Sequence, residues 1–392
     1  MSEEEKKEES KQNEKLSDKD EDILKNLDTS NKNKDQSSKQ IQKDKSEENN
    51  KYIKKYKSND KRLYGITFQS SIESNIINFA VSSLNINEEN NIKILSFIQE
   101  DIEEEEENTI DTNINNIKKS EDNNIKLKCQ EKCDFPVSSI LFSPHEENKN
   151  LLISTSDILN VYSYENEKLI ITATSKKKTG KYCGPLTSCD WSRANNAIIG
   201  SSNQDHTCSI WDLNKLTEKY MIVAHDKEVY DIALGPDEFL FMSTGADGSV
   251  RLFDSRQPNS SSILFETADQ SPITRLKWNL VDPNFILTVI IDKNEIFILD
   301  IRKLDEPYAI LKDHTNVVNN AIWAPQSNTN LISVSDDKSA LLWDIYCDSK
   351  KNVESIMKYE AENEIENVSW EEKTQSWIGI VVGNQAEVLK IQ

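Results

Sequence analysis

The sequence predicts an all-β fold, a propeller of seven blades preceded by a head of low complexity. Two markers recur at a constant offset: a large apolar residue ends a predicted first strand, and 19 to 21 residues later an apolar or aromatic residue ends a predicted third strand. The pairs are Phe142/Tyr162, Trp191/Trp211, Leu234/Phe253, Trp278/Leu299, Trp323/Trp343 and Trp370/Leu389. One such repeat cannot bury both of its faces alone, so the repeats must stack against one another.

Residues 221–256 show the plan of one repeat most clearly. Alternating apolar residues predict a strand ending at Leu234, and Gly235-Pro236-Asp237 predicts the turn that follows. A second strand ends before Asp247-Gly248, a dipeptide that favours a tight hairpin. The third strand ends in Phe253-Asp254, and the corresponding pairs elsewhere are Trp211-Asp212, Leu299-Asp300 and Trp343-Asp344, spaced 42, 46 and 44 residues. This period and the Trp-Asp pair are typical of WD repeats.

The chain begins with a segment that does not fit the repeats. Residues 1–50 consist almost entirely of Lys, Glu, Asp, Asn, Ser and Gln, and they predict a disordered head because they offer too little apolar surface to offset the entropy of ordering. The propeller is predicted to span 51–392. Its last repeat ends after a third strand, so 51–57 is predicted to supply the missing outer strand and close the ring. A basic localisation signal within 51–62 is the alternative interpretation.

The first repeat is the longest, since Phe68 and Leu95 are 27 residues apart. Residues 99–123 follow it and carry ten acidic residues and two lysines, which predicts a disordered acidic insertion between the first and second blades. A docking tail for a basic partner is the alternative. The remaining blades are predicted to contain residues 151–164 (second), 187–211 (third), 221–256 (fourth), 273–300 (fifth), 317–344 (sixth) and 365–391 (seventh).

Composition excludes several classes of protein. No apolar run approaches the ~20 residues of a membrane span, and no apolar stretch follows Met1, so neither a membrane segment nor a secretory signal is expected. The net charge of −21 argues against phosphate-backbone binding. The six cysteines, including Cys129 and Cys133, and the four histidines show no metal-ligand spacing, so no metal or cofactor is expected and the thiols are those of an intracellular protein.

Some polar residues fall at the positions where propeller blades carry a buried hydrogen-bonded tetrad. In the sixth repeat these are His314, Ser333, Asp337 and Trp343. The fourth repeat has His225, Ser243 and Asp247 but carries Phe253, which lacks a donor, and the third has Ser201, Asp205 and Trp211 without the histidine. A catalytic Ser-His-Asp interpretation is rejected because no nucleophile elbow or oxyanion-hole motif accompanies these residues.

Several segments resemble one WD-repeat family: AHDKEVYDIA (224–233), GADGSVRLFDSR (245–256), PLTSCDW (185–191), AIWAP (321–325) and ALLWDI (340–345). It is the plant transparent-testa-glabra and anthocyanin-regulator family, whose animal members are cullin-associated WD-repeat adaptors. The similarity covers 134–391 well and 52–98 weakly; the head and the acidic segment depart from it. It implies a non-enzymatic scaffold that binds protein kinases of the dual-specificity tyrosine-regulated class or transcription regulators.

Two surfaces are candidates for partner binding. Cullin-ligase receptors commonly carry Trp-Asp-x-Arg at the ends of two consecutive blades. Here Phe253 and Leu299 replace the tryptophan, and the Asp-x-Arg part is kept by Asp254, Arg256, Asp300 and Arg302. Arginine forms planar bidentate contacts with a carboxylate, either on an adaptor subunit or within its own blade. The second candidate is the entry of the fourth blade, with Asp226, Lys227, Glu228 and Tyr230.

The sequence therefore predicts a monomeric scaffold of the cytoplasm and nucleus that presents protein partners on the propeller faces. A substrate receptor of a cullin-RING ubiquitin ligase is the alternative. A propeller hydrolase or lyase would need histidines or acidic residues converging on the central channel, and none is evident from the sequence. A histone-tail reader would need a long additional N-terminal helix.

Overall fold

The computed structural model describes residues 52–70, 75–86, 88–99, 125–175, 184–215, 217–345 and 352–391. The predicted head (1–50) and nearly all of the predicted acidic insertion (99–123) therefore lie outside the described residues. The second of the chain's two units, Lys54–Gln392, holds almost everything that is described. In the described part of the chain, no helix has the length and apolar character of a membrane span.

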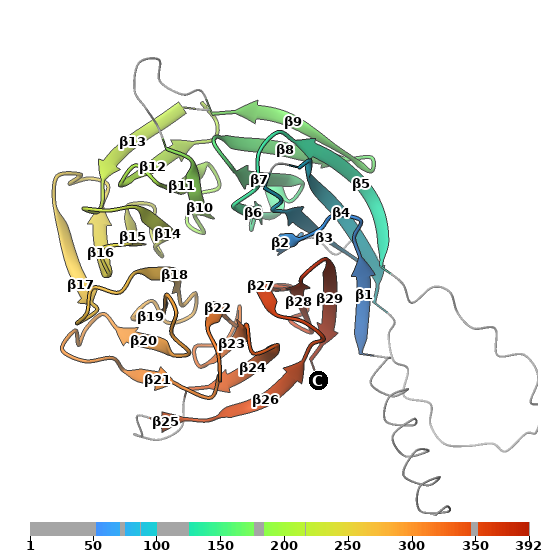
Figure 1. The fold of residues 1–392 in the computed structure, drawn as a ribbon. Helices are drawn as coiled ribbons and strands as arrows, with labels where there is room; N and C mark the ends of the chain where they lie inside the picture. The colour runs from blue at the N-terminus through green and yellow to red at the C-terminus, as the bar shows by residue number, and fades with distance from the viewer. Residues whose placement is uncertain are drawn as a thin grey trace, which may run out of the picture. The chain divides into compact units, whose positions relative to one another are not determined.

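Seven sheets follow one another round a central axis, as Figure 1 shows, and all their strand pairs are antiparallel except one pair in the fifth blade. The first blade contains β2 (Leu63–Phe68), β3 (Ile76–Ser83), β4 (Asn90–Ile98) and β5 (Lys126–Cys133). The second contains β6 (Ser139–Phe142), β7 (Leu151–Thr155), β8 (Leu159–Glu165) and β9 (Lys168–Thr174), with a 3-10 turn at Glu146–Asn148. The third contains β10 (Leu186–Trp191), β11 (Ile198–Asn203), β12 (Thr207–Asp212) and β13 (Thr217–Val223).

The fourth blade is β14 (Val229–Leu234), β15 (Leu240–Gly245), β16 (Ser249–Asp254) and β17 (Ser261–Glu266). The fifth has β18 (Ile273–Trp278), β19 (Phe285–Ile290), β20 (Ile296–Asp300), β21 (Ala309–Leu311) and, from further along the chain, β25 (Asn352–Val353); the sixth has β22 (Val318–Trp323), β23 (Asn330–Ser335), β24 (Ser339–Asp344) and β26 (Ser355–Glu360). The seventh has β27 (Ile365–Trp370), β28 (Trp377–Val382), β29 (Gln385–Lys390) and β1 (Ile53–Lys57). The predicted seven-bladed all-β fold is confirmed.

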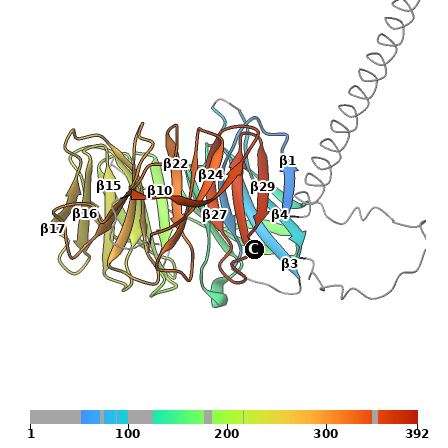
Figure 2. The same cartoon turned by 90° about the horizontal axis from the view of Figure 1, so that it is seen from below.

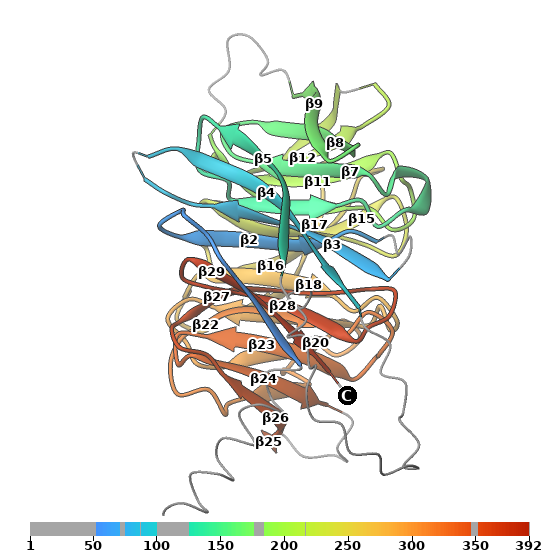
Figure 3. The ribbon, with the colours of Figure 1, turned by 90° about the vertical axis from the view of Figure 1, so that its right-hand side faces the viewer.

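The inner strands share one irregularity that sets the shape of the central channel. In six of the seven blades the register between the first two strands shifts between the first and third residues of the inner strand, as at Val229/Asp231 and Ile273/Arg275. Such a bulge bends the strand and re-aims the side chains beyond it. Figure 1 shows the inner strands nearest the axis and the outer strands on the circumference, and Figure 2 and Figure 3 show the ring of blades from the side. In these six blades the third residue of the inner strand lines the channel.

β1 lies beside β29 as the outer strand of the last sheet, next to the first blade. Lys54 is only 6% exposed; its Nζ donates to the carbonyl of Ile98 at 2.7 Å and lies 5.3 Å from the ring centre of Phe97. Lys55 forms an ion pair with the buried Glu387 of β29 at 2.7 Å. The two lysines thus join the N-terminal strand to both blades that flank the closure of the ring.

Two features of the sheets differ from the sequence-based expectation. The acidic segment connects β4 to β5, which are the third and outer strands of one sheet, so it interrupts the first blade and does not separate the first and second blades. β5 has the sequence KLKCQEKC, and its charged residues interrupt the apolar alternation from which strands are predicted. The second difference is β25, which comes from the connection between two strands of the sixth blade yet pairs in parallel with β21 of the fifth.

Candidate protein-interaction site

The sixth blade contains a complete buried tetrad. The Nε1 of Trp343 donates to Ser333 Oγ at 2.8 Å, His314 Nε2 contacts the same oxygen at 2.7 Å, and His314 Nδ1 lies 2.8 Å from Asp337. Burial alone would raise the pKa of Asp337, but hydrogen bonds from Ser339 and His314 lower it to about 2. These bonds join β23 and β24 to the connection before β22 and to the turn between β23 and β24. The Ser, His and Asp therefore satisfy a buried indole donor, which is a structural role.

The other blades keep the tetrad only in part. In the fourth blade His225 bonds Ser243 at 2.8 Å and Asp247 at 2.9 Å, while Phe253 stacks on Phe241 with ring centres 5.0 Å apart. In the third blade Trp211 donates to Ser201 at 2.9 Å, while Asp205 accepts from Thr207 at 2.5 Å. In the fifth, Leu299 stands at the tryptophan position, and the buried hydroxyl of Thr288 has no hydrogen-bond partner among the described residues.

The two Asp-x-Arg motifs are built alike. Arg256 binds Asp254 through Nε and Nη2 at 2.9 and 2.6 Å, and Arg302 binds Asp300 in the same way at 2.8 and 2.7 Å. Each aspartate has a lowered pKa because its arginine donates to it. The guanidinium groups lie over aromatic rings, 4.7 Å from Phe239 for Arg256 and 5.6 Å from Phe285 for Arg302. Both arginines are thus bonded within their own blades.

These arginines nevertheless stay at the surface, with side chains 58% and 56% exposed. The connections β14–β15, β16–β17, β18–β19 and β20–β21 all leave the antiparallel sheets at the same end of the strands, so one face of blades 4 and 5 presents both arginines. The same connections expose the large apolar residues Leu280, Val281, Leu304 and Tyr308, each 45% to 49% exposed. We call this surface the Asp-x-Arg face. Its apolar members were not predicted, because nothing in the spacing of loop residues marks them.

The second candidate surface lies at the opposite end of the strands. Asp226 and Lys227 are exposed, and Asp226 forms an ion pair with Arg251 at 2.9 Å. Tyr230 lies near Glu228 and lines a hollow of about 500 Å³ together with Tyr64 and Arg275, whose guanidinium donates to the Tyr64 hydroxyl at 2.6 Å. The structure thus places the two predicted surfaces on opposite faces of the propeller.

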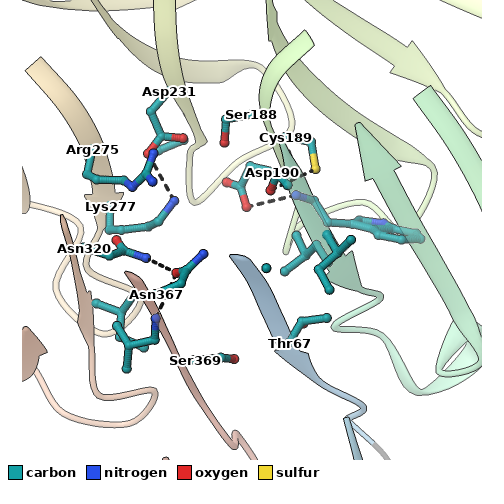
Figure 4. Close-up of a pocket in the computed structure, with 18 of the residues that line it drawn as sticks. Thr67, Ser188, Cys189, Asp190, Asp231, Arg275, Lys277, Asn320, Asn367 and Ser369 are labelled. Atoms are coloured by element: carbon teal, nitrogen blue, oxygen red, sulfur yellow. Dashed lines mark hydrogen bonds and ion pairs between the residues drawn. The ribbon is translucent and has the colours of Figure 1, made fainter. Parts of the chain in front are cut away.

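Charged residues converge on the central channel, contrary to the expectation from the sequence. Figure 4 shows Asp190, Asp231 and Lys277 directed into it from β10, β14 and β18. Asp190 accepts from the backbone of Trp191 at 2.9 Å and of Leu234, in the next blade, at 2.7 Å. Spacing along one strand gave no sign of this convergence, because Asp190, Asp231 and Lys277 come from three different blades. Burial raises the pKa of Asp190.

Asp231 repeats this arrangement one blade further on. It accepts from the backbone of Ile232 at 3.0 Å and of Leu276 at 2.9 Å, and Lys277 lies 3.3 Å away. These carboxylates join neighbouring blades, and their oxygens are already occupied by donors. Throughout the described ranges no group of three or more His, Cys, Asp or Glu residues has the geometry of a metal site. The carboxylates of the channel therefore hold neighbouring blades together.

Comparison with known proteins agrees with this architecture. The WD domain, G-beta repeat family matches residues 174–212, 216–254 and 305–344. The chain is 35% identical over 276 residues to the DDB1- and CUL4-associated factor 7 homolog of Dictyostelium discoideum, covering 69% of this chain and 85% of that protein. It is 28% identical over 329 residues to a WD repeat-containing protein of Schizosaccharomyces pombe, covering 66% of this chain and 75% of that protein. The chain therefore belongs to the WD-repeat family that includes the DDB1- and CUL4-associated factor 7 homolog.

Proposed function

We propose that this protein is a non-enzymatic adaptor that presents protein partners on the faces of its propeller. The observation that carries the proposal is the Asp-x-Arg face, where two exposed arginines share one end of the strands with the exposed residues Leu280, Val281, Leu304 and Tyr308. Arginine and aromatic residues supply most of the binding energy at protein interfaces. The resemblance to plant and animal adaptors supports kinases of the dual-specificity tyrosine-regulated class and transcription regulators as partners, in the cytoplasm and nucleus.

A second function, substrate receptor of a cullin-RING ubiquitin ligase, is favoured by one detail of the same face. Each aspartate holds its arginine by Nε and Nη2, and no described residue accepts a hydrogen bond from Nη1 of Arg256 or Arg302. The intrablade pair fixes the guanidinium plane and leaves one edge for a carboxylate of an adaptor subunit. The name of the Dictyostelium relative, which associates it with DDB1 and CUL4, supports this assignment.

Affinity purification from the native cell tests both functions. Wild type is compared with Arg256→Ala/Arg302→Ala by quantitative mass spectrometry. The matched control is Arg193→Ala, which removes an arginine that pairs with Glu372 outside blades 4 and 5.

Selective loss of a cullin-adaptor subunit from the double variant supports the receptor function. Kinases or transcription regulators recovered equally with all three proteins support the scaffold function and make the two arginines structural. Recovery of no protein partner with wild type contradicts both.

A further inference from the structure

Arg275 differs from the other arginines of the chain because no described carboxylate lies within ion-pairing distance of it. The other five each form an ion pair: Arg62, Arg193, Arg251, Arg256 and Arg302. Arg275 is partly buried, and it donates to the Tyr64 hydroxyl at 2.6 Å and to the carbonyl oxygen of Thr274 at 3.4 Å. A guanidinium has five N–H donors, and a charge removed from water is normally paired. Arg275 therefore keeps donors for an anionic acceptor that the described residues do not supply.

Arg275 reaches across the channel at the end opposite the Asp-x-Arg face. It belongs to β18 of the fifth blade, and Tyr64 belongs to β2 of the first, which lies three blades further round the ring. Each residue stands near the start of its inner strand. Arg275 lines both the channel and the hollow of about 500 Å³, whereas Tyr64 lines the hollow. The guanidinium is thus available from the hollow.

Two tyrosine hydroxyls add donors to the same hollow. Tyr230 lines it, and its hydroxyl has no hydrogen-bond partner in the described part of the chain. Burial and the charge of Glu228 raise the pKa of Tyr230, so this hydroxyl keeps its proton at neutral pH. The Tyr64 hydroxyl accepts from Arg275 and retains its own proton to donate. A guanidinium and neighbouring hydroxyl donors are the groups that bind a carboxylate or a phosphate.

The charges that line the hollow distinguish between these two anions. Asp292, in the connection β19–β20, is exposed, and Asp336, in the connection β23–β24, accepts from Asn319 at 2.6 Å. Their negative charges oppose a phosphate group, which carries about −1.5 to −2 at neutral pH, more strongly than a singly charged carboxylate. The same charges favour basic residues beside the anion. The hollow therefore fits an acidic residue that has basic neighbours.

We propose that this hollow, which we call the Arg275 hollow, binds a segment of a partner protein through one aspartate or glutamate side chain. The carboxylate accepts from Arg275 and from the hydroxyls of Tyr64 and Tyr230. Basic residues next to it in the segment face Asp292 and Asp336. The proposal rests on the adaptor function proposed above, and it assigns a partner segment to the face opposite the Asp-x-Arg face.

A peptide library tests the proposal on the full chain. Each peptide has a central glutamate and random flanking residues, and the peptides retained by the immobilised chain are sequenced. The best peptide is then made again with glutamine or phosphoserine in place of the glutamate, and affinities are measured by fluorescence anisotropy. We expect lysine and arginine to be enriched beside the glutamate. We expect the glutamate peptide to bind at least about tenfold more tightly than either counterpart.

Three variants locate the bound peptide. Arg275→Gln should weaken binding of the glutamate peptide at least about tenfold, and Tyr230→Phe should weaken it roughly fivefold. Because the Tyr230 hydroxyl has no described partner, its removal leaves the fold intact, so this variant decides even if Arg275→Gln fails to fold. Tyr220→Phe is the matched control, since Tyr220 lies on the outer strand β13, and it should bind as wild type does.

The proposal is overturned if the chain retains no glutamate peptide, if the phosphoserine counterpart binds more tightly, or if Tyr230→Phe or a folded Arg275→Gln binds as wild type does. The failure of this proposal is distinguishable from a failure of the adaptor function. Partners recovered by affinity purification together with any of these results would leave the adaptor function standing.

Discussion

At the scale of the residue, one repeat position has opposite consequences in two neighbouring blades. Ser333 of the sixth blade receives the indole N–H of Trp343 and contacts His314. Thr288 holds the same position in the fifth blade, but its hydroxyl finds no partner among the described residues. A satisfied buried hydroxyl contributes to stability, whereas an unsatisfied one costs the desolvation of the group. The repeat fixes where a polar group is placed, and its neighbours decide whether the group stabilises the fold.

We expect Ser333→Ala to lower the free energy of unfolding by about 1–3 kcal/mol, because it leaves the Trp343 indole donor without an acceptor and removes the hydroxyl that contacts His314 Nε2. Thr288→Val removes an unsatisfied hydroxyl at constant shape and should leave the free energy of unfolding unchanged or raise it by up to about 1 kcal/mol. Urea unfolding midpoints at equal m values measure both. Equal losses in the two variants would mean that packing, and not hydrogen bonding, governs this position.

At the scale of the element, the inner strands are joined in pairs by side chains in the channel. Asp190 joins β10 to β14, Asp231 joins β14 to β18, and Asn320 donates to Asn367 at 2.6 Å between β22 and β27. Each contact crosses from one blade to the next close to the axis, where the strands approach most closely. The blades are therefore fastened by polar contacts at the axis and by apolar clusters further out.

Asp231→Ala tests this fastening. The substitution leaves the backbone N–H groups of Ile232 and Leu276 without their acceptor and Lys277 without its counter-ion, so we expect the free energy of unfolding to fall by about 2–4 kcal/mol. Asp226→Ala is the control, since that carboxylate is 84% exposed in its ion pair with Arg251 and should contribute less than about 1 kcal/mol. Thermal and urea unfolding measure both variants. A loss no larger than that of the control would contradict the proposed fastening.

At the scale of the whole propeller, closure depends on β1, a strand distant in sequence from the sheet it completes. Its pairing with β29 covers what would otherwise be an unpaired edge of the last sheet. Lys55 also supplies the cation for Glu387, whose side chain is 1% exposed and accepts a hydrogen bond from Tyr359 at 2.6 Å. Loss of the strand therefore opens an edge and leaves a buried carboxylate with less compensation.

A chain that begins at Ser58 should be less stable than one that begins at Tyr52 by at least about 3 kcal/mol, and it should associate through the exposed β29 edge. Unfolding temperature and size-exclusion chromatography measure the two effects. The full-length chain is the reference that isolates the contribution of residues 1–51. If the two shortened chains are equally stable and equally monomeric, β1 does not close the ring.

Much of the fold was predictable because short sequence patterns that repeat along the chain specify it. The offset between Trp191 and Trp211 is kept through six repeats, and the longer repeat with Phe68 and Leu95 makes the seventh blade; each repeat must bury its faces against its neighbours. The outer strand β5 was not predicted, because an edge strand has no second apolar face and its sequence therefore lacks a clear apolar pattern. The borrowed strand β25 was missed because two residues carry no period at all.

The sequence by itself determined the propeller, its seven blades and the residues at each repeat position. Only the tertiary structure decided which of those residues meet: Asp190, Asp231 and Lys277 come from three different blades, and they converge because the ring brings their inner strands to one axis. The same holds for Trp211 and Trp343, which hold the same position in their repeats. Trp343 belongs to a buried apolar cluster that includes Val353 of β25, whereas Trp211 is partly exposed, and this difference depends on packing between blades and not on any local pattern.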